Sequence, residues 1–155
     1  MIPVLTKLME HVDKPVLELG VGWNSTPLLH WLCKEKGIQI TSVESEKDWL
    51  NKFLMYMEDG HNFIYNKFDK PLDFEGEMGL VLIDHRPARK RRSSAKYFAD
   101  KAEFVLLHDS ELADNPAYKY TGVYGNFKYR YEYKGVGKPY TMILSNTIDI
   151  ERILK

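Results

Sequence analysis

The segment VLELGVGWNSTPLL, residues 16–29, decides how the chain folds. It begins with the apolar run VLEL, which is typical of a buried strand, passes through a turn with two glycines, and ends where a helix starts. Such a corner occurs in ordinary strand-to-helix connections and also in loops that hold a cofactor. The sequence pattern of the remaining chain is therefore needed to decide whether this corner is an ordinary connection or a cofactor loop.

Strand and helix patterns alternate on both sides of this segment. Apolar spacing predicts helices at residues 1–12, 25–37, 45–60, 86–101 and 111–120, the last one broken by Pro116. Apolar and β-branched runs predict further strands at residues 38–44, 61–66, 79–84 and 102–109, with a loop at residues 67–77. Together with VLEL this makes five strands, and their alternation with helices predicts a parallel sheet covered on both faces.

The C-terminal part of the chain changes to an antiparallel pattern. In NFKYRYEYKG, residues 126–135, Phe127 and three tyrosines alternate with charged residues, which predicts a strand with one aromatic face. PYTMILSN, residues 139–146, follows after a turn with glycines, so the two runs predict a closing hairpin. The aromatic face either packs as core beneath a helix or forms a stacking wall for a sugar or aromatic ligand. The predicted fold is α/β, a Rossmann-like three-layer sandwich whose mostly parallel sheet ends in an antiparallel hairpin.

Length and composition favour one domain, which we place over residues 1–155. The formal charge is zero, so no overall field favours nucleic acid or an anionic membrane. Cys33 is the single cysteine, which excludes an internal disulfide and predicts a buried thiol in a reducing compartment. The chain lacks the pattern of a signal peptide and the roughly 18 to 20 apolar residues of a membrane helix. We therefore expect a cytoplasmic protein, and a homo-oligomer is compatible with the sequence.

Polar or small residues stand at the predicted carboxyl end of every parallel strand. In an open α/β sheet ligands bind beyond these ends, near the point where the strand order reverses. The residues at the five ends are Glu18 with Gly20 and Gly22, Glu44, Asn66, Asp84 with His85, and His108 with Asp109. A ligand site is therefore predicted at this edge of the sheet.

The glycines and acids indicate how a ligand could be held. Gly20 and Gly22 allow a tight turn and a close approach of a ligand to the backbone. Glu44 stands where an acid would accept hydrogen bonds from both hydroxyls of a ribose, although it could alternatively cap the helix that follows it. The dinucleotide fingerprint G-x-G-x-x-G requires a third glycine where Ser25 stands, which argues against a dinucleotide.

The order of these motifs resembles that of the class I S-adenosylmethionine-dependent methyltransferases. VLELGVGWNSTPLL is similar to the E-x-G-x-G-x-S-T variant of the family's cofactor loop, and the acid of TSVES follows the next strand. LVLIDHRPARKRR, VLLHDSE and the hairpin with PYT come in the family's order, so the resemblance covers nearly the whole chain. The D/N-P-P-[YFW] motif of the nucleic-acid amino methyltransferases is absent, because Asp84 is followed by HRPA.

The resemblance implies S-adenosylmethionine as the cofactor, held by the loop after the first strand. Glu18 would hold its amino group through hydrogen bonds or water, and Glu44 would bind the ribose. The residues implied to contact the cofactor are Glu18, Gly20, Val21, Gly22, Trp23, Asn24, Ser25, Thr26, Glu44 and Asp84. The candidates for the adenine site are Asn66, Phe68 and Asp69.

Methyl transfer from a sulfonium is an in-line displacement, and a hydroxyl acceptor must also lose a proton. The predicted catalytic residues are Asp84, His85 and Asp109, with His108 either a further candidate base or a core histidine. The two strand ends also resemble those of catechol-type O-methyltransferases, which implies that Asp84 and Asp109 could hold a magnesium ion. Ser110 stands where that subfamily has an asparagine as the third ligand, which argues against the metal.

The sequence therefore predicts a methyltransferase acting on a small molecule or carbohydrate, with oxygen favoured over nitrogen as the acceptor atom. The chain has no long insertion, so the rim of the sheet, the N-terminal helix or a partner subunit would contact the acceptor. RPARKRR, residues 86–92, is either a solvated helix start or a site for an anionic acceptor. Two alternatives stay open: a scaffold with this fold but no turnover, and another nucleotide-binding Rossmann protein.

Overall fold

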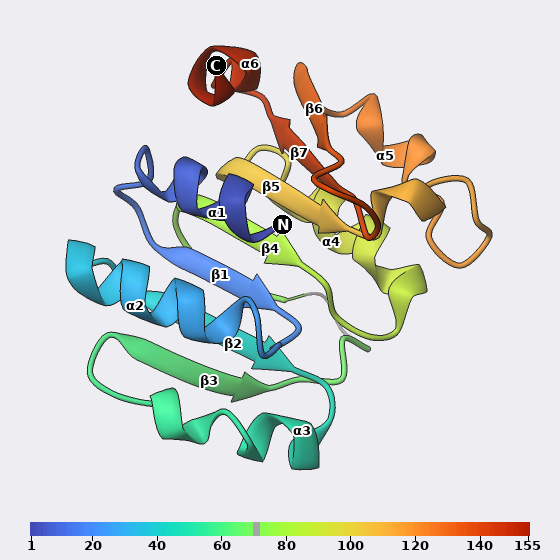
Figure 1. Cartoon of the computed structure of the whole chain (residues 1–155). Coiled ribbons are helices and arrows are strands. Elements are labelled where there is room, and N and C mark those ends of the chain that lie inside the picture. Colours follow the sequence, from blue (N-terminus) through green and yellow to red (C-terminus); the bar gives the residue numbers. More distant parts are fainter. Residues whose placement is uncertain (70–71) are drawn as a thin grey trace.

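The computed structural model describes residues 1–69 and 72–155 and contains a seven-stranded sheet. The strands are β1 (Val16–Leu19), β2 (Ile40–Glu44), β3 (His61–Tyr65), β4 (Met78–Ile83), β5 (Ala102–His108), β6 (Tyr129–Tyr133) and β7 (Thr141–Ser145). They lie in the order β3-β2-β1-β4-β5-β7-β6, which runs from bottom to top in Figure 1. The order reverses between β1 and β4, so the ends of these two strands flank the expected ligand position.

The first five strands are parallel, and the last two complete the sheet in antiparallel orientation. β1 lies between β2 and β4, with Glu18 opposite Ser42 on one side and Leu82 on the other. β7 runs antiparallel to β5, and β6 runs antiparallel to β7. The predicted α/β sandwich with a mostly parallel sheet and an antiparallel C-terminal hairpin is confirmed.

Helices cover both faces of the sheet. α1 (Ile2–Met9), α2 (Thr26–Lys36) and α6 (Ile150–Leu154) lie in front of it in Figure 1, while α4 (Arg91–Phe98) and α5 (Thr121–Tyr124) lie behind it. Successive residues of the central strands alternate between the two sides, as the period of two requires. Leu80 and Leu82 join the core with α1 and α2, whereas Val81 and Ile83 join the core with α4.

Several segments differ from the predictions made from local sequence. The helix predicted over residues 45–60 is α3 (Lys47–Asn51) followed by the 3-10 helix η1 (Leu54–Tyr56). Leu50 and Phe53 are its buried residues, so the stretch lacks the apolar stripe that a long helix would bury. The helix predicted over residues 86–101 is the 3-10 helix η2 (Ala88–Lys90) followed by α4. The helix predicted over residues 111–120 is the short 3-10 helix η3 (Ser110–Leu112) followed by turns. The sequence did not predict α6.

The aromatic residues near the C-terminus lie in two different cores. The three tyrosines of β6 pack against the cluster that includes Ile150 of α6, which agrees with core packing beneath a helix. Phe127 precedes β6 and is buried in the cluster on the other side of the sheet, so its prediction on the same face was wrong.

The predicted loop at residues 67–77 contains neither helix nor strand in its described part, and Lys70 and Pro71 lie outside the described residues. None of the helices formed by residues 1–69 and 72–155 has both the length and the apolar character needed to cross a membrane.

Candidate functional site

Gly20 brings the loop after β1 directly against the end of β4. Its φ is +98°, and a Cβ atom there would lie 2.6 Å from both the carbonyl carbon of Asp84 and the amide nitrogen of His85. A side chain is therefore excluded twice, by backbone conformation and by contact with a neighbouring strand. The packing of two strands explains this glycine without a ligand.

Gly22, in contrast, faces open space. The nearest atom to a Cβ there would be Ser25 Oγ at 3.4 Å. The Gly22 N–H donates a hydrogen bond to Thr26 Oγ1 (2.9 Å), and the Thr26 hydroxyl donates its proton between the two carboxylate oxygens of Glu18 (2.9 and 3.0 Å). The loop is thus attached to the first turn of α2 while its outer side stays accessible.

Glu18 lies beneath this loop and is fully buried. Ser42 Oγ on the neighbouring strand donates a second hydrogen bond to its carboxylate (2.7 Å). Burial raises the pKa of Glu18 to about 7, and hydrogen bonds from Ser25, Ser42 and Thr26 oppose that rise. Glu18 therefore supports the loop from behind, and any action on a cofactor would pass through Thr26, the loop backbone or water.

Glu44 joins the loop after β1 to the turn after β2. One carboxylate oxygen accepts a hydrogen bond from the backbone N–H of Val21 (3.2 Å), and the other accepts from Ser45 and from Glu46 (3.0 Å). Both donors precede α3, whose N-cap residue is Glu46 and which has no side-chain cap within the described residues, so Glu44 fixes the turn before the helix and does not cap it. The oxygen next to Val21 has one long hydrogen bond and keeps capacity to accept another.

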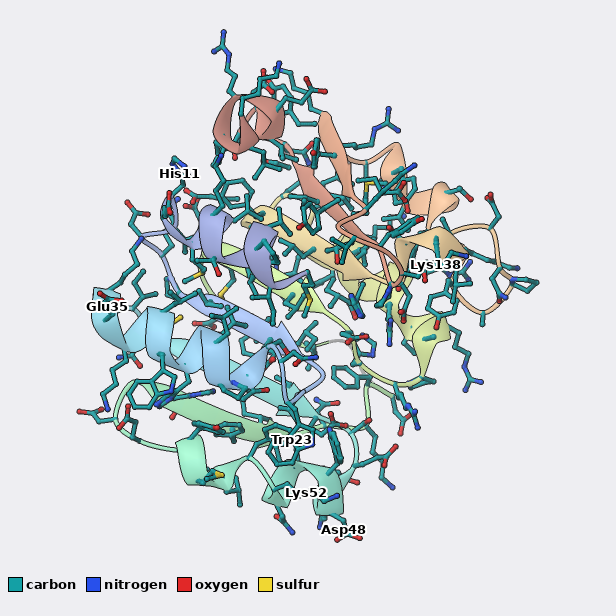
Figure 2. All side chains as sticks on the ribbon, viewed as in Figure 1. His11, Trp23, Glu35, Asp48, Lys52 and Lys138 are labelled. Carbon is teal, nitrogen blue, oxygen red and sulfur yellow. The ribbon has the colours of Figure 1, made fainter. Side chains whose placement is uncertain are left out.

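Trp23 continues the loop as a partly exposed aromatic residue. Its ring lies 4.6 Å from that of Phe53 and 6.1 Å from that of Trp49, beside α3 (Figure 2). The Trp49 indole N–H in turn donates to the carbonyl oxygen of Val21 (2.9 Å). This small cluster anchors the loop and leaves 56% of Trp23 exposed.

Arg91 is a functional candidate that the local sequence did not reveal. Its guanidinium is buried at the start of α4, whereas the local sequence predicts a solvated helix start or an anion site for RPARKRR. It binds Asp84 Oδ1 at 2.8 Å and Asp109 Oδ2 at 2.9 Å, and it donates to the carbonyl oxygens of Asp84 and His85. One fixed cation therefore holds both acids at the ends of β4 and β5.

The position of Arg91 does not fit a divalent ion between Asp84 and Asp109. Magnesium needs carboxylate oxygens that are free to coordinate it, and here a guanidinium takes up an oxygen of each acid. The two acids are thus paired with a protein cation in the place where a metal would bind.

His85 points away from the open edge of the sheet. It is 1% exposed, stacks on the ring of Phe68 at 3.8 Å between ring centres, and lies 3.0 Å from Ser94 Oγ through Nε2. Burial, with a contribution from Arg91, lowers its pKa to about 3. A neutral, enclosed imidazole of this kind is suited to packing Phe68 against β4 and is poorly placed to touch a substrate.

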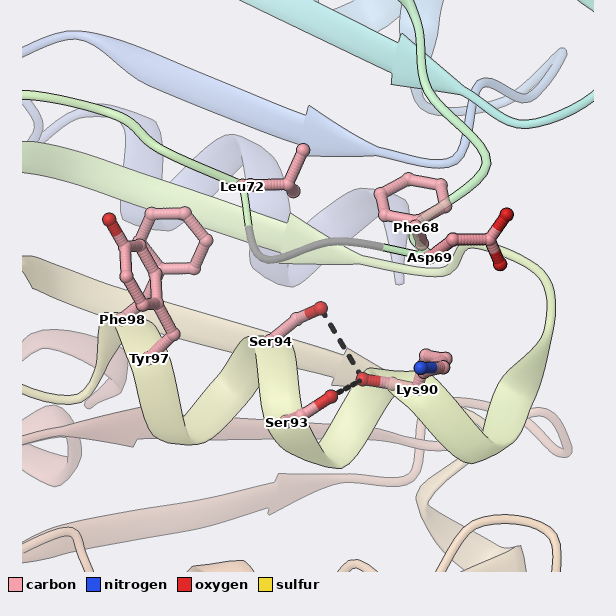
Figure 3. A pocket seen from close by; sticks show the side chains of 8 residues that line it. All are labelled: Phe68, Asp69, Leu72, Lys90, Ser93, Ser94, Tyr97 and Phe98. Carbon is pink, nitrogen blue, oxygen red and sulfur yellow. Dashed lines mark hydrogen bonds between the residues drawn. The ribbon is translucent and has the colours of Figure 1, made fainter.

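The adenine candidates lie close to this stack. Asn66 Oδ1 accepts a hydrogen bond from the Phe68 N–H (2.7 Å), and Phe68 and Asp69 line a cavity of about 310 Å³ against α4. Figure 3 shows this cavity with the hydroxyls of Ser93 and Ser94 directed at the Lys90 carbonyl oxygen. Because it lies along α4, it is separate from the glycine loop.

A larger cavity lies at the ends of β1, β4 and β5. It has a volume of about 420 Å³ and is lined by the glycine loop from Gly22 to Ser25, by Asp84 and by His108, and by the turn of the β6–β7 hairpin and the N-terminus. A neighbouring cavity of about 620 Å³ shares Asp84 and His108 and adds Arg91, Asp109 and Tyr118. His108, with a side chain 15% exposed, is thus the histidine that opens to both cavities.

The structure therefore divides the predicted site residues into three groups. The first group lines the cavity of about 420 Å³ and consists of Gly22, Trp23, Asn24, Ser25 and Asp84. The second group is buried and fixes the conformation of the loop; its members are Glu18, Gly20, Val21, Thr26 and Glu44. Asp109 is tied to Arg91, and His85 faces α4. The HDS sequence at the end of β5 was the signal for His108, but its exposure could not be read from the sequence.

The sheet order, the glycine loop after β1 and the acid after β2 together define a class of proteins: the chain has the class I S-adenosylmethionine-dependent methyltransferase fold. No family model and no curated protein matches its sequence. It is similar to the solved structure of the O-methyltransferase TomG from Streptomyces achromogenes in complex with SAM, at 11% identity and a TM-score of 0.66, covering 93% of this chain and 78% of that chain.

Two further solved structures give the same result. The N-methyltransferase NodS from Bradyrhizobium japonicum WM9 is 6% identical with a TM-score of 0.64, covering 92% of this chain and 90% of that chain. TrmK from M. capricolum in complex with S-adenosyl-homocysteine is 12% identical with a TM-score of 0.59, covering 92% of this chain and 67% of that chain. At such low identities these likenesses show the fold of this chain.

Proposed function

We propose that the protein is an S-adenosylmethionine-dependent methyltransferase that methylates an oxygen of a small molecule or glycan. The observation that supports it most is the cavity of about 420 Å³ onto which the glycine loop, Asp84 and His108 all open. A cofactor on the loop and an acceptor at the strand ends would meet there. Its volume falls within the roughly 300 to 1,000 Å³ of small-molecule sites, which favours a small acceptor.

The residues of the loop fit the proposed cofactor. Gly22 leaves the backbone open to a ligand, and the Glu44 oxygen beside Val21 can accept a hydrogen bond from a ribose hydroxyl. S-adenosylmethionine, when bound, supplies an electrophilic methyl group on a positively charged sulfur. The partly exposed carboxylate of Asp84 lies on the same cavity and favours a cation there.

His108 is the residue that we assign to proton removal from the acceptor hydroxyl. Its ring lines both cavities, and Nε2 lies 3.9 Å from Asp109 Oδ1. A proton taken up at Nε2 would therefore lie beside the Asp109 carboxylate. Arg91 holds Asp109 in place, so Asp109 acts as a positioning residue.

Ligand binding tests the proposal directly. Native mass spectrometry of the purified protein, together with titration calorimetry, is expected to show one molecule of S-adenosylmethionine or S-adenosylhomocysteine per chain. NAD is expected not to compete, in agreement with Ser25 in place of a third glycine. Absence of binding for both adenosyl compounds at millimolar concentration would overturn the proposed function.

Glu44→Gln is expected to weaken S-adenosylhomocysteine binding by roughly ten-fold to a hundred-fold, because a charged hydrogen-bond acceptor contributes about 1.5 to 3 kcal/mol. Calorimetry on a variant with an unchanged circular dichroism spectrum measures it. Glu46→Gln, at an exposed neighbouring acid, is the matched control and should bind like the wild type. An unchanged affinity of Glu44→Gln would assign Glu44 to the turn before α3 alone.

His108→Gln is expected to lower kcat by about 10² to 10⁴, as removal of a general base does. Cofactor affinity should change by less than about three-fold, since the loop does not depend on this ring. Steady-state kinetics with an accepted hydroxyl substrate gives kcat and KM, and His11→Gln, at an exposed position of the α1 end, is the control. A wild-type kcat for His108→Gln would exclude it as the base.

A scaffold that binds the cofactor without turnover is a second candidate. The pairing of Arg91 with both Asp84 and Asp109 favours it, because neither acid is left entirely free for chemistry. Bound cofactor that is never consumed across a broad panel of hydroxyl and amine acceptors would support the scaffold over the enzyme.

A further inference from the structure

A line of polar side chains runs through the protein from the glycine loop to the opposite edge of the sheet; its members are Glu18, Ser42, His61, His30 and Glu58. Ser42 Oγ lies 2.7 Å from Glu18 Oε2 and 2.9 Å from His61 Nε2. The Nδ1 atoms of His61 and His30 lie 3.1 Å apart, and His30 Nε2 lies 3.5 Å from Glu58 Oε1. The first four side chains are buried and the last reaches the surface.

The hydrogen bonds of this line can run in either of two directions. An ionised Glu18 can only accept, so Ser42 donates to it and accepts from the Nε2–H of His61. The bare Nδ1 of His61 must then accept from the Nδ1–H of His30. When Glu18 is protonated, each hydrogen bond runs the other way. Glu18 then donates to Ser42, Ser42 donates to Nε2 of His61, and the Nδ1–H of His61 donates to Nδ1 of His30. The remaining hydrogen of His30, on Nε2, faces the carboxylate of Glu58.

Burial favours the direction with a protonated Glu18. It raises the pKa of Glu18 to about 7 and lowers that of His61 to about 4, and it also lowers the pKa of His30. A neutral Glu18 beside two neutral imidazoles keeps charge out of the interior and leaves it on Glu58 at the surface. The uncharged line is therefore the resting state near pH 6.

Neighbouring charges act in the same direction. Among the described residues, the titratable groups that face the line from adjoining elements include Asp84, Tyr56, Cys33, Lys34 and Asp59. Asp84 disfavours a charge on Glu18, and Lys34, 2.9 Å from Glu58, stabilises the Glu58 carboxylate. Burial raises the pKa of the Cys33 thiol to about 12, so Cys33 adds no charge.

We propose that this line is a proton relay that couples cofactor binding to proton release at the far edge of the sheet. A cation at the glycine loop favours the ionised form of Glu18. The Glu18 carboxylate accepts a hydrogen bond from the Thr26 hydroxyl, which in turn accepts one from the Gly22 N–H of the loop. Each member then passes one proton to the next, and one proton leaves His30 to water beside Glu58. No bond other than O–H and N–H bonds changes, so one proton is released for each cofactor bound.

The outer end of the relay has access to solvent. His30, His61 and Glu58 line a cavity of about 240 Å³ at the amino-terminal ends of β2 and β3, where His61 is the first residue of its strand. The inference rests on the proposed function in one respect, namely that the cation at the glycine loop is S-adenosylmethionine. The relay itself belongs to the ligand-free protein and can be tested without any cofactor.

The first test measures the tautomer of His61 by ¹⁵N NMR of the ligand-free protein between pH 5 and pH 8.5. We expect a neutral ring with hydrogen on Nδ1 near pH 6, and a change to hydrogen on Nε2 as pH rises through about 7 and Glu18 ionises. His11, which is exposed at the end of α1 (Figure 2) and is not a member of the line, is the internal control. One unchanged tautomer over this range, or a charged His61 at pH 6, would overturn the relay.

The variant Glu18→Gln tests whether ionisation of Glu18 causes the change in the His61 tautomer. The glutamine amide does not ionise, so the tautomer of His61 should stay the same at every pH in the folded variant. Ser42→Ala, which cuts the line but leaves Glu18 in place, serves if that variant does not fold, and it should also abolish the tautomer change near pH 7. A wild-type change in both variants would contradict the proposal.

The second test measures proton release on binding. Calorimetry with S-adenosylmethionine at pH 6.5, in two buffers of different ionisation enthalpy, is expected to show release of about one proton per cofactor in the wild type and none in Glu18→Gln. Equal release in both proteins would overturn the coupling. If the cofactor does not bind at all, the proposed function fails, and the NMR test still decides whether the relay exists.

Discussion

Replacing Arg91 by methionine is expected to lower the free energy of unfolding by about 3 to 5 kcal/mol, because it removes the buried cation that two partly exposed carboxylates share. Asp84 and Asp109 would then lie close together without the cation that binds both, and the carbonyl oxygen of His85 would lose its donor. In a protein of this size such a loss corresponds to a fall in Tm of roughly 10 °C or more. Urea unfolding followed by circular dichroism measures it.

The effect of Arg91→Met should also depend on pH. Burial raises the pKa of Asp84 and Arg91 opposes that rise, so without Arg91 the pKa of Asp84 in the folded variant moves higher still. A carboxyl whose pKa is higher in the folded than in the unfolded state favours folding at low pH. The loss caused by Arg91→Met should therefore be smaller at pH 4.5 than at pH 7.5.

Arg92→Met is the matched control for Arg91→Met. Arg92 is the next residue of α4 and is exposed, so its replacement should change stability by less than about 0.5 kcal/mol at either pH. Arg91→Lys keeps the charge but loses the planar guanidinium that binds two acids. Its stability should therefore lie between those of Arg91→Met and Arg92→Met. Equal stability of Arg91→Met and Arg92→Met would refute the role of the bridge.

Gly20→Ala is expected to cost about 2 to 6 kcal/mol, which combines the strain of a side chain at positive φ with overpacking against a rigid neighbour. The new Cβ atom would lie 2.6 Å from backbone atoms of Asp84 and His85, and backbone of a central strand cannot move aside as a side chain can. Because domains are stable by only about 5 to 15 kcal/mol, the variant should have a much lower Tm or remain unfolded.

Gly22→Ala is the control for Gly20→Ala, two residues away in the same loop. Among the residues that the structure describes, a Cβ atom at Gly22 would contact Ser25 Oγ alone, at 3.4 Å, so the variant should fold with nearly wild-type stability. It would, however, project into the cavity where the cofactor is proposed, and S-adenosylhomocysteine binding should weaken. Thermal unfolding and calorimetry on both variants distinguish the two roles, and equal Tm values would contradict the structural role of Gly20.

The sequence predicted the strands better than the helices, because a buried strand has an uninterrupted apolar signature. GLVLID and AEFVLLHD were recognisable in isolation, and their parallel pairing followed from the alternation with helices. The stretch from residue 45 to 60 was misread, since its apolar residues include exposed Met55 and Met57 as well as buried Phe53. Whether an apolar side chain is buried depends on what packs against it, and local spacing does not contain that information.

Local sequence alone determined the class of this protein: the glycine turn after the first strand, the acid after the second and the final hairpin are each encoded within a few neighbouring residues. The tertiary structure decided which side chains of the site contact one another. Arg91 meets Asp109 across 18 residues, and His30 meets His61 across 31. Such contacts arise when separate elements pack on one sheet, so the buried bridge and the line of histidines become visible only in the folded chain.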